Sequence, residues 1–198
     1  GPSFASEVAR RSPTAVVAAA PDLECAREVQ GVFMSPWFRV YTSQDVLGVQ
    51  LGGALKNVYA IGAGLIDGLE LGHNAKAAYM TRALAELSRL ARAMGAQPAT
   101  IPGLSGAGDL ILTCTGPYSR NRWCGMELAK VRDLKEIVSS TPMVIEGIPA
   151  ASAARALSRK YEVEMPIAAA IFQVLYEGKP AAATVDALMT RAPKREDA

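Results

Sequence analysis

Apolar residues recur at helical spacing along most of the chain after about residue 45. The longest such stripe advances by four, three, four and three residues through Met80, Leu84, Leu87, Ala91 and Met94. This spacing puts the five side chains on one face of an α-helix, which we predict to start at the cap residue Asn74 and to stop at Gly95. Similar patterns predict helices at 119–129, 134–139, 148–160, 166–177 and 181–189.

The first 45 residues instead show short apolar runs between turn residues. Residues 14–20 and 38–42 are predicted as strands, and Pro21 ends the first. Helices are predicted at 3–11 and 22–29, with Gly31 stopping the second. Two strands cannot form a stable domain alone, so this part is predicted to be the tail of a larger sheet. We therefore predict a mainly α fold with an α/β region at 1–45 and an all-helical domain at 46–198; only the tail 194–198 lacks a pattern.

The composition is that of a soluble globular protein and does not indicate nucleic-acid binding or a membrane span. Half of the 198 residues are hydrophobic and a fifth are charged, which is ordinary for a soluble globular protein. A net charge of +2 is too small to indicate nucleic-acid binding, and no apolar run is long enough to span a membrane. The chain does not begin with methionine and shows no signal peptide, so we expect a fragment or a processed chain.

The cysteines do not suggest a metal site. Cys25, Cys114 and Cys124 form no CxxC pair, and the chain has one histidine, His73. We predict that the three thiols are small buried hydrophobes and that no metal is bound. His73 suits a polar residue just before a helix cap better than a general base.

Lys56 is the first candidate for chemistry. It lies in Leu-Gly-Gly-Ala-Leu-Lys-Asn, among small and apolar residues. A desolvated ammonium is a usable acid or base near neutral pH; an exposed or structurally salt-bridged lysine is the alternative. The stretch 45–68 carries glycine at six positions, which favours close approach of another backbone or of a ligand. We reject Gly62-Ala-Gly64 as a dinucleotide fingerprint, because its spacing is wrong and its surroundings are helical.

Two further motifs supply a carboxylate and anion-binding groups. Gly-Leu-Ser-Gly-Ala-Gly-Asp at 103–109 lacks the lysine of a phosphate loop and is predicted to be a tight turn that points Asp109 inward. Ser-Arg-Asn-Arg at 119–122 offers a hydroxyl, an amide and two guanidiniums at a helix start. These groups suit a phosphate dianion, although a solvated helix start would have the same composition.

Taken in order, five blocks resemble NAD(P)-dependent glycerol-3-phosphate dehydrogenase. They are Gly-Pro-Ser-Phe-Ala at 1–5, the Lys56 and Asp109 motifs, Ser-Arg-Asn-Arg, and Val-Ile-Glu-Gly at 144–147. The likeness extends from Gly1 to Met189 and covers roughly the last three-fifths of such an enzyme. It implies that 1–45 is the tail of a Rossmann-type dinucleotide-binding domain. The family's glycine fingerprint and its earlier lysine are absent here, and Val131 stands where the family usually has glycine.

The resemblance also implies roles for individual residues. Lys56 would be the proton acceptor. The substrate would be held by Gly1, Ser3, Lys56, Asp109, Ser119, Arg120 and Asn121. The cofactor, NAD or NADP, would be bordered by Ala5, Arg120, Val144 and Glu146.

The implied reaction interconverts glycerol 3-phosphate and dihydroxyacetone phosphate for glycerophospholipid synthesis. The resemblance further implies a cytoplasmic homodimer (plastid location being the alternative in a eukaryote), and the chain by itself is expected to be inactive. Two alternatives stay open. One is a sister dehydrogenase for another small hydroxyl compound, although its lysine and asparagine are commonly one helical turn apart. The other is a catalytically inactive helical module for oligomerisation.

Overall fold

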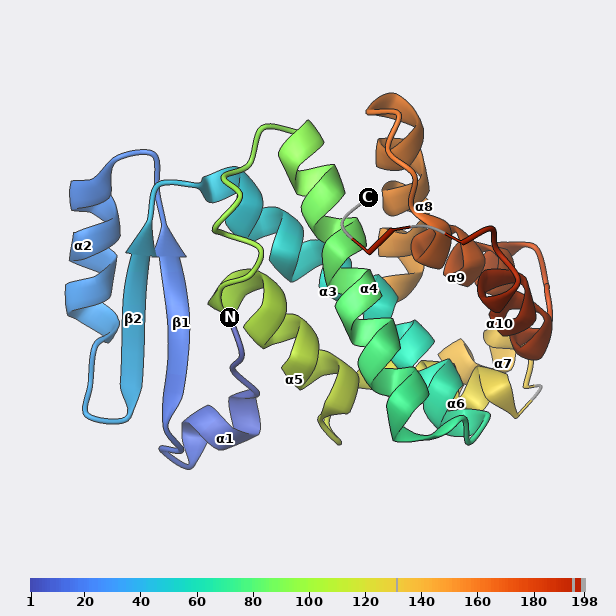
Figure 1. The fold of residues 1–198 in the computed structure, drawn as a ribbon. Helices are drawn as coiled ribbons and strands as arrows, with labels where there is room; N and C mark the ends of the chain where they lie inside the picture. Colours follow the sequence, from blue (N-terminus) through green and yellow to red (C-terminus); the bar gives the residue numbers. More distant parts are fainter. Residues whose placement is uncertain (131, 194, 197–198) are drawn as a thin grey trace.

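A computed structural model describes residues 1–130, 132–193 and 195–196. It has a small parallel sheet with flanking helices at one end and a larger group of helices at the other (Figure 1). The predicted fold class, mainly helical with a small α/β part, is confirmed. Val131 and three residues of the predicted tail, Lys194, Asp197 and Ala198, lie outside the described residues. Among those described, no helix is both long and apolar enough to cross a bilayer.

The α/β part contains α1 (Ala5–Ala9), β1 (Thr14–Ala19), α2 (Leu23–Phe33) and β2 (Phe38–Ser43). The strands are parallel, in a register that pairs Thr14 with Phe38 and Ala19 with Ser43. Asp22 caps α2 by accepting a hydrogen bond from the backbone N–H of Glu24. The predicted stop at Gly31 is wrong, because α2 continues to Phe33. A glycine inside a helix weakens it by about 1 kcal/mol, which packing readily outweighs.

Among the described residues, the helical part contains nine further elements. They are α3 (Val46–Gly68), α4 (Gly72–Ala93), the π-helix η1 (Leu104–Gly108), α5 (Asp109–Thr115), α6 (Arg120–Ala129), α7 (Leu134–Ser139), α8 (Gly147–Lys160), α9 (Pro166–Tyr176) and α10 (Ala181–Met189). The predicted stripe on α4 is confirmed, since Leu87 and Ala91 are buried and Met80, Leu84 and Met94 pack against the same core. The last strand ends at Ser43 and α3 begins at Val46, but the division into two domains stays a prediction.

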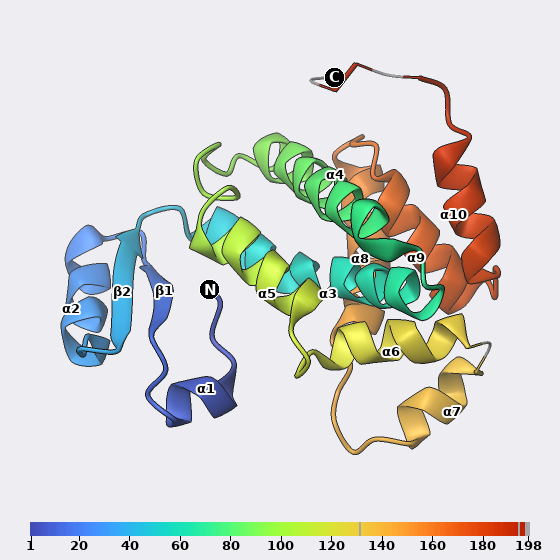
Figure 2. The same ribbon diagram turned by 60° about the horizontal axis from the view of Figure 1, so that its bottom comes forward.

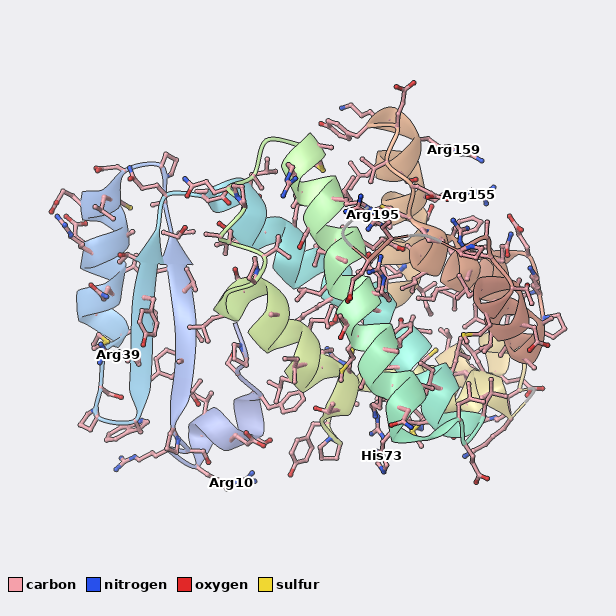
Figure 3. All side chains as sticks on the ribbon, viewed as in Figure 1. Arg10, Arg39, His73, Arg155, Arg159 and Arg195 are labelled. Carbon is pink, nitrogen blue, oxygen red and sulfur yellow. The ribbon has the colours of Figure 1, made fainter. Side chains whose placement is uncertain are left out.

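The start of α4 differs from the prediction. The helix begins at Gly72 and its first turn has no side-chain cap, so His73 and Asn74 lie inside it rather than before it. The chain turns sharply before this point, because Glu70 and Gly72 both have positive φ values, of 55° and 85°. The helix starts directly at the end of this turn, before the predicted cap residue Asn74. His73 is exposed and projects from the end of the molecule at which α4 begins (Figure 3).

α3 runs through the middle of the helical part, with α4, α5, α6, α8 and α9 around it (Figures 1 and 2). Its glycines are where neighbouring backbones come closest. A Cβ on Gly64 would lie 1.9 Å from the carbonyl oxygen of Arg122, and a Cβ on Gly125 of α6 would lie 1.9 Å from that of Ile61. The expectation that these glycines allow close backbone approach is thus confirmed for α3 and α6.

A buried carboxylate fixes the start of α9. Glu86 of α4 accepts hydrogen bonds from the backbone N–H groups of Ile167 and Ala168 at 2.9 and 2.8 Å, and from the hydroxyl of Tyr59 at 3.3 Å. It replaces the missing side-chain cap at Met165. Burial raises the pKa of Glu86 from 4.5 to about 7. The sequence showed no sign of this role.

Candidate active site

Lys56 and Asp109 form an ion pair. The Lys56 Nζ lies 2.6 Å from Oδ1 of Asp109. The lysine side chain is 21% exposed and the aspartate side chain 5%. The inward direction predicted for Asp109 is therefore confirmed. The sequence argument about Lys56 was incomplete, because a carboxylate faces the ammonium in addition to the apolar residues around it.

The glycine-rich segment before Asp109 brings this pair together. The tight turn predicted here is a single π-helical turn that continues directly into α5. The turn sits against α3 so closely that a Cβ on Gly52 would be 2.3 Å from the carbonyl oxygen of Ser105. Gly106 is equally confined, because its Cβ would be 2.0 Å from the carbonyl oxygen of Ile101. Gly52 lies one helical turn before Lys56 on α3, so this close contact brings the start of α5, with Asp109, to the Lys56 side chain.

The first residues of the chain extend to the same place. The N-terminus lies between β1 and α5 (Figure 1), and the nitrogen of Gly1 is 3.4 Å from Oδ2 of Asp109. Ser3 is exposed and its hydroxyl donates to the carbonyl oxygen of Gly1 at 3.0 Å. The ring of Phe4 packs edge-on against Tyr118, just before α6. Ala5 is the exposed first residue of α1.

The start of α6 is joined to α3 and α8 by Asn121. The amide nitrogen of this side chain donates to Oδ1 of Asn57 at 2.9 Å, and its oxygen accepts from the backbone N–H of Gly147 at 2.8 Å. Because Asn57 follows Lys56 directly, the network joins the α6 N-terminus to the turn of α3 that carries Lys56. Ser119 caps α6 by accepting from the backbone N–H of Arg122 at 3.2 Å, which confirms the predicted polar start.

Arg120 is held at the surface of this network. Its Nη2 lies 2.6 Å from Oε1 of Glu146, and the two side chains are 40% and 44% exposed. Val144, two residues before Glu146, is 68% exposed. The half-exposed guanidinium of Arg120 therefore keeps N–H donors that can reach a ligand. It lies at the N-terminal end of α6, where the backbone N–H groups of the first turn lack helical acceptors.

Arg122 does not take part in this arrangement. Its Nε lies 2.6 Å from Oδ2 of Asp67, which also pairs with Lys76 at 2.8 Å. The sequence interpretation that both guanidiniums of Ser-Arg-Asn-Arg face one phosphate is therefore wrong for Arg122. A helix separates residues two positions apart by about 200°, so the two arginines leave α6 on different sides.

The burial of the cysteines agrees with the prediction for two of the three. Cys114 and Cys124 are buried, and burial raises the pKa of each thiol to about 12. Cys25 is exposed on α2, so the prediction that all three are buried is wrong for it. Within the described part of the chain, no three histidine, cysteine, aspartate or glutamate side chains are grouped as a metal site would require.

Sequence reasoning also left two contact residues out of the site. Asn57 stood within the Lys56 motif, and a polar residue in a buried run was the available signal. Gly147 gave no signal beyond its place in Val-Ile-Glu-Gly. A Cβ at Gly147 would lie 2.5 Å from the carbonyl oxygen of Asn57 and 2.8 Å from Oδ1 of Asn121, so only glycine fits there. The roles of the site residues toward substrate and cofactor stay predictions.

A group of helices that holds a lysine–aspartate pair, with a basic helix start on a neighbouring helix, and that follows a parallel β–α–β unit is the arrangement expected of a nicotinamide-dependent dehydrogenase. The family model described as NAD-dependent glycerol-3-phosphate dehydrogenase C-terminus matches residues 45–186. The chain belongs to this family, and the expected resemblance is confirmed.

Similar proteins and similar solved structures are also named glycerol-3-phosphate dehydrogenases. A protein of Geobacter metallireducens named glycerol-3-phosphate dehydrogenase [NAD(P)+] is 58% identical over 196 residues, 99% of this chain and 58% of the relative. One of Chlorobium limicola with the same name is 49% identical over 99% of this chain and 59% of its own length. The crystal structure of the Coxiella burnetii glycerol-3-phosphate dehydrogenase has a TM-score of 0.93 at 40% identity, covering 96% of this chain and 59% of that one. The chain thus spans about three-fifths of the length of the curated relatives it matches.

Proposed function

We propose that this chain carries the substrate-binding part of a glycerol-3-phosphate dehydrogenase, which interconverts sn-glycerol 3-phosphate and dihydroxyacetone phosphate with NAD or NADP. The observation that carries the proposal is the 2.6 Å Lys56–Asp109 pair, linked through Asn57 and Asn121 to the helix start that bears Arg120. An acid–base group and an anion site on adjoining helices suit a small phosphorylated hydroxy compound.

In this proposal the phosphate binds at the start of α6. Arg120 offers a planar guanidinium, and the first-turn N–H groups of Arg120 and Asn121 offer further donors. Ser119 lies at the same helix end as the cap. Binding the phosphate there holds carbon 2 of the substrate near Lys56, and this remote binding energy is used to position the reacting carbon.

Lys56 would move the proton. In the reducing direction its ammonium donates to the carbonyl oxygen of dihydroxyacetone phosphate, and in the oxidising direction the amine takes the proton back from the hydroxyl. Asp109 accepts a hydrogen bond from the ammonium, so it orients Lys56 in both directions. Gly1 lies close enough to border the substrate, because its nitrogen is 3.4 Å from Asp109. Ser3 is next to Gly1, since its hydroxyl donates to the carbonyl oxygen of Gly1 at 3.0 Å.

Exposed residues near Arg120 suit the binding of a dinucleotide. Glu146 is a half-exposed carboxylate, which suits the hydroxyls of a ribose. Val144 presents an exposed apolar side chain nearby, and Ala5 leaves the start of α1 uncrowded. When bound, NADH or NADPH would supply the hydride that reduces carbon 2.

A chimaera tests the role of Lys56. The part of the Geobacter metallireducens relative that precedes its match to this chain is fused to residue 1, and NADH or NADPH oxidation is followed with dihydroxyacetone phosphate. Lys56→Ala should lower turnover by about 10²- to 10⁴-fold, the usual effect of losing an acid–base group. Lys130→Ala, which removes an exposed lysine paired with Glu127 at the other end of α6, is the control and should leave turnover unchanged.

Turnover of Lys56→Ala within about threefold of the parent would remove Lys56 from this role. An inactive parent chimaera would favour the oligomerisation module instead. The 198-residue chain alone is the second control and is expected not to oxidise NAD(P)H. Its described β1–α2 turn holds Pro21 and Asp22 rather than the glycines that a pyrophosphate requires.

Arg120→Lys tests recognition of the phosphate. The variant keeps the charge but loses the planar fork. Its kcat/KM should fall by about tenfold or more for dihydroxyacetone phosphate and much less for unphosphorylated dihydroxyacetone. An equal fall for the two substrates would show that Arg120 does not bind the phosphate.

The proposal extends to the setting of the enzyme. It includes a cytoplasmic homodimer whose product enters glycerophospholipid synthesis. Support for this comes only from the family to which the chain belongs. Light scattering of the chimaera after gel filtration tests the dimer, and a monomer at micromolar concentration would contradict it.

A further inference from the structure

A buried carboxylate joins the start of α3 to the segment that leads into Asp109. Asp45 is the cap residue of α3 and is 7% exposed. Its Oδ1 accepts a hydrogen bond from the backbone N–H of Gly48 at 2.9 Å, within the first turn of the helix. Its Oδ2 accepts from the backbone N–H of Gln97 at 2.8 Å, in the segment between α4 and η1. One carboxylate therefore caps α3 and also holds a segment 52 residues further along the chain.

The two segments are in close contact at this carboxylate. A Cβ on Gly48 would lie 2.2 Å from Oδ2 of Asp45 and 2.8 Å from Cγ2 of Thr100, so residues 97–100 lie directly on the first turn of α3. Burial raises the pKa of the Asp45 carboxyl, but hydrogen bonds from Thr100 and from the two backbone N–H groups bring it below its usual value. Asp45 is thus a charged acceptor at neutral pH, and hydrogen bonds to a charged acceptor are stronger than those between neutral groups.

Backbone hydrogen bonds continue from Gln97 to the residue before Asp109. The N–H of Thr100 donates to the carbonyl oxygen of Gln97, and the N–H of Gly103 donates to that of Thr100, each at 3.1 Å. The N–H of Gly108 donates to the carbonyl oxygen of Gly103, again at 3.1 Å. In Figure 1 this segment runs from the end of α4 past the start of α3 to the start of α5. A shift at residue 97 is therefore passed on to the first residue of α5.

The segment and α3 are joined at two ends. At one end Asp45 holds Gln97, and at the other Lys56 pairs with Asp109 at 2.6 Å. The two joins are about 16 Å apart along α3, at 1.5 Å per residue. We infer that Asp45 is a positioning residue, which sets where α5 begins and so keeps the Asp109 carboxylate on Lys56. The inference deepens the proposed function and rests on it for the kinetic effects.

Asp45→Asn breaks the join to Gln97 and leaves the helix cap in place. Asparagine caps helices as well as aspartate does, so its one side-chain oxygen stays on the N–H of Gly48. Its amide nitrogen then faces the N–H of Gln97, and two donors cannot form a hydrogen bond. Asp133→Asn is the matched control, because Asp133 is exposed and caps α7 by accepting from the backbone N–H of Lys135 at 2.7 Å.

Kinetics of the chimaera test the effect on the reaction. Asp45→Asn should lower kcat for dihydroxyacetone phosphate, per folded molecule, by about 10- to 100-fold, because misplacing a reacting group by about 1 Å can cost 10²-fold. The KM should stay within about threefold, since the substitution leaves the start of α6 unchanged. Asp133→Asn should change neither constant. A kcat of Asp45→Asn within about twofold of the parent would overturn the inference.

A double variant shows whether Asp45 acts through Asp109. The effects of distant residues on free energy usually add. If Asp45 only positions Asp109, Asp45→Asn combined with Asp109→Ala should be no slower than Asp109→Ala alone, within about twofold. Losses that multiply would show that Asp45 acts by another route and would overturn the inference.

Hydrogen exchange tests the same join without any enzyme activity. In the 198-residue chain the N–H groups of Ala107 and Gly108 are hydrogen-bonded within the segment, at 2.8 and 3.1 Å. In Asp45→Asn, nuclear magnetic resonance should show both exchanging faster by about tenfold or more. The N–H of Ile167 at the start of α9 is the reference and should keep its parent rate. Unchanged rates at Ala107 and Gly108, or an equal rise at Ile167, would overturn the inference. Faster exchange together with an inactive parent chimaera would refute only the proposed function.

Discussion

Replacing Gly64 by alanine tests the close contact between α3 and α6. The added Cβ would lie 1.9 Å from the carbonyl oxygen of Arg122 and 2.9 Å from the Cα of Gly125, whereas real Cβ atoms stay beyond 3.0 Å. Both obstacles are backbone atoms, so α6 must move away from α3 by about 1 Å. Overpacking of this kind costs about 1–3 kcal/mol. Alanine returns about 1 kcal/mol of helix propensity, which leaves a net loss of up to about 2 kcal/mol.

Gly53→Ala is the matched control on the same helix. A Cβ there would meet nothing within 4 Å, so alanine should raise stability by up to about 1 kcal/mol. Urea unfolding of the 198-residue chain, followed by far-ultraviolet circular dichroism, measures both variants. The gain in helix propensity is common to both variants, so Gly64→Ala should be less stable than Gly53→Ala by the overpacking cost alone, about 1–3 kcal/mol.

Equal stability of the two variants would refute the argument, because it would show that α3 and α6 can separate freely. Gly125→Ala provides a second check, since its Cβ would meet the carbonyl oxygen of Ile61 at 1.9 Å in the same contact. Once one alanine has parted the helices, the other should cost less. The double variant is therefore expected to lose less stability than the two single losses added together.

Two further predictions concern buried titratable groups. Burial raises the pKa of Glu86 from 4.5 to about 7, so the folded chain binds this proton more tightly than the unfolded chain. The contribution is largest below about pH 4.5, and about 3 kcal/mol of it is lost as pH rises to about 7. Glu86→Gln should remove this loss, as urea midpoints at about pH 5.5 and pH 8 can show; parallel pH profiles would contradict the assignment. With a thiol reagent at neutral pH, Cys25 should react in the folded chain, whereas Cys114 and Cys124 should react only after unfolding.

Local signals in the sequence were enough for much of the fold. The apolar stripe of α4, the Ser119 cap of α6 and the limits of α7 and α10 followed from spacing and from residues whose preferences act within one turn. Such local preferences are the same whatever the rest of the fold is. They fail where packing outweighs them, as at Gly31, where about 1 kcal/mol of helix propensity did not stop α2.

The sequence also determined which residues are candidates for chemistry, because Lys56, Asp109 and Arg120 belong to motifs that recur as a set. Only the tertiary structure decided what each of them faces. Arg120 and Arg122 have the same chemistry, yet one pairs with Glu146 and the other with Asp67. Asn57 joined the site because α6 lies against α3 closely enough for Asn121 to reach it. These partners come from distant parts of the chain. The distances between their side chains depend on how the helices pack, and the spacing of residues along the sequence does not determine that packing.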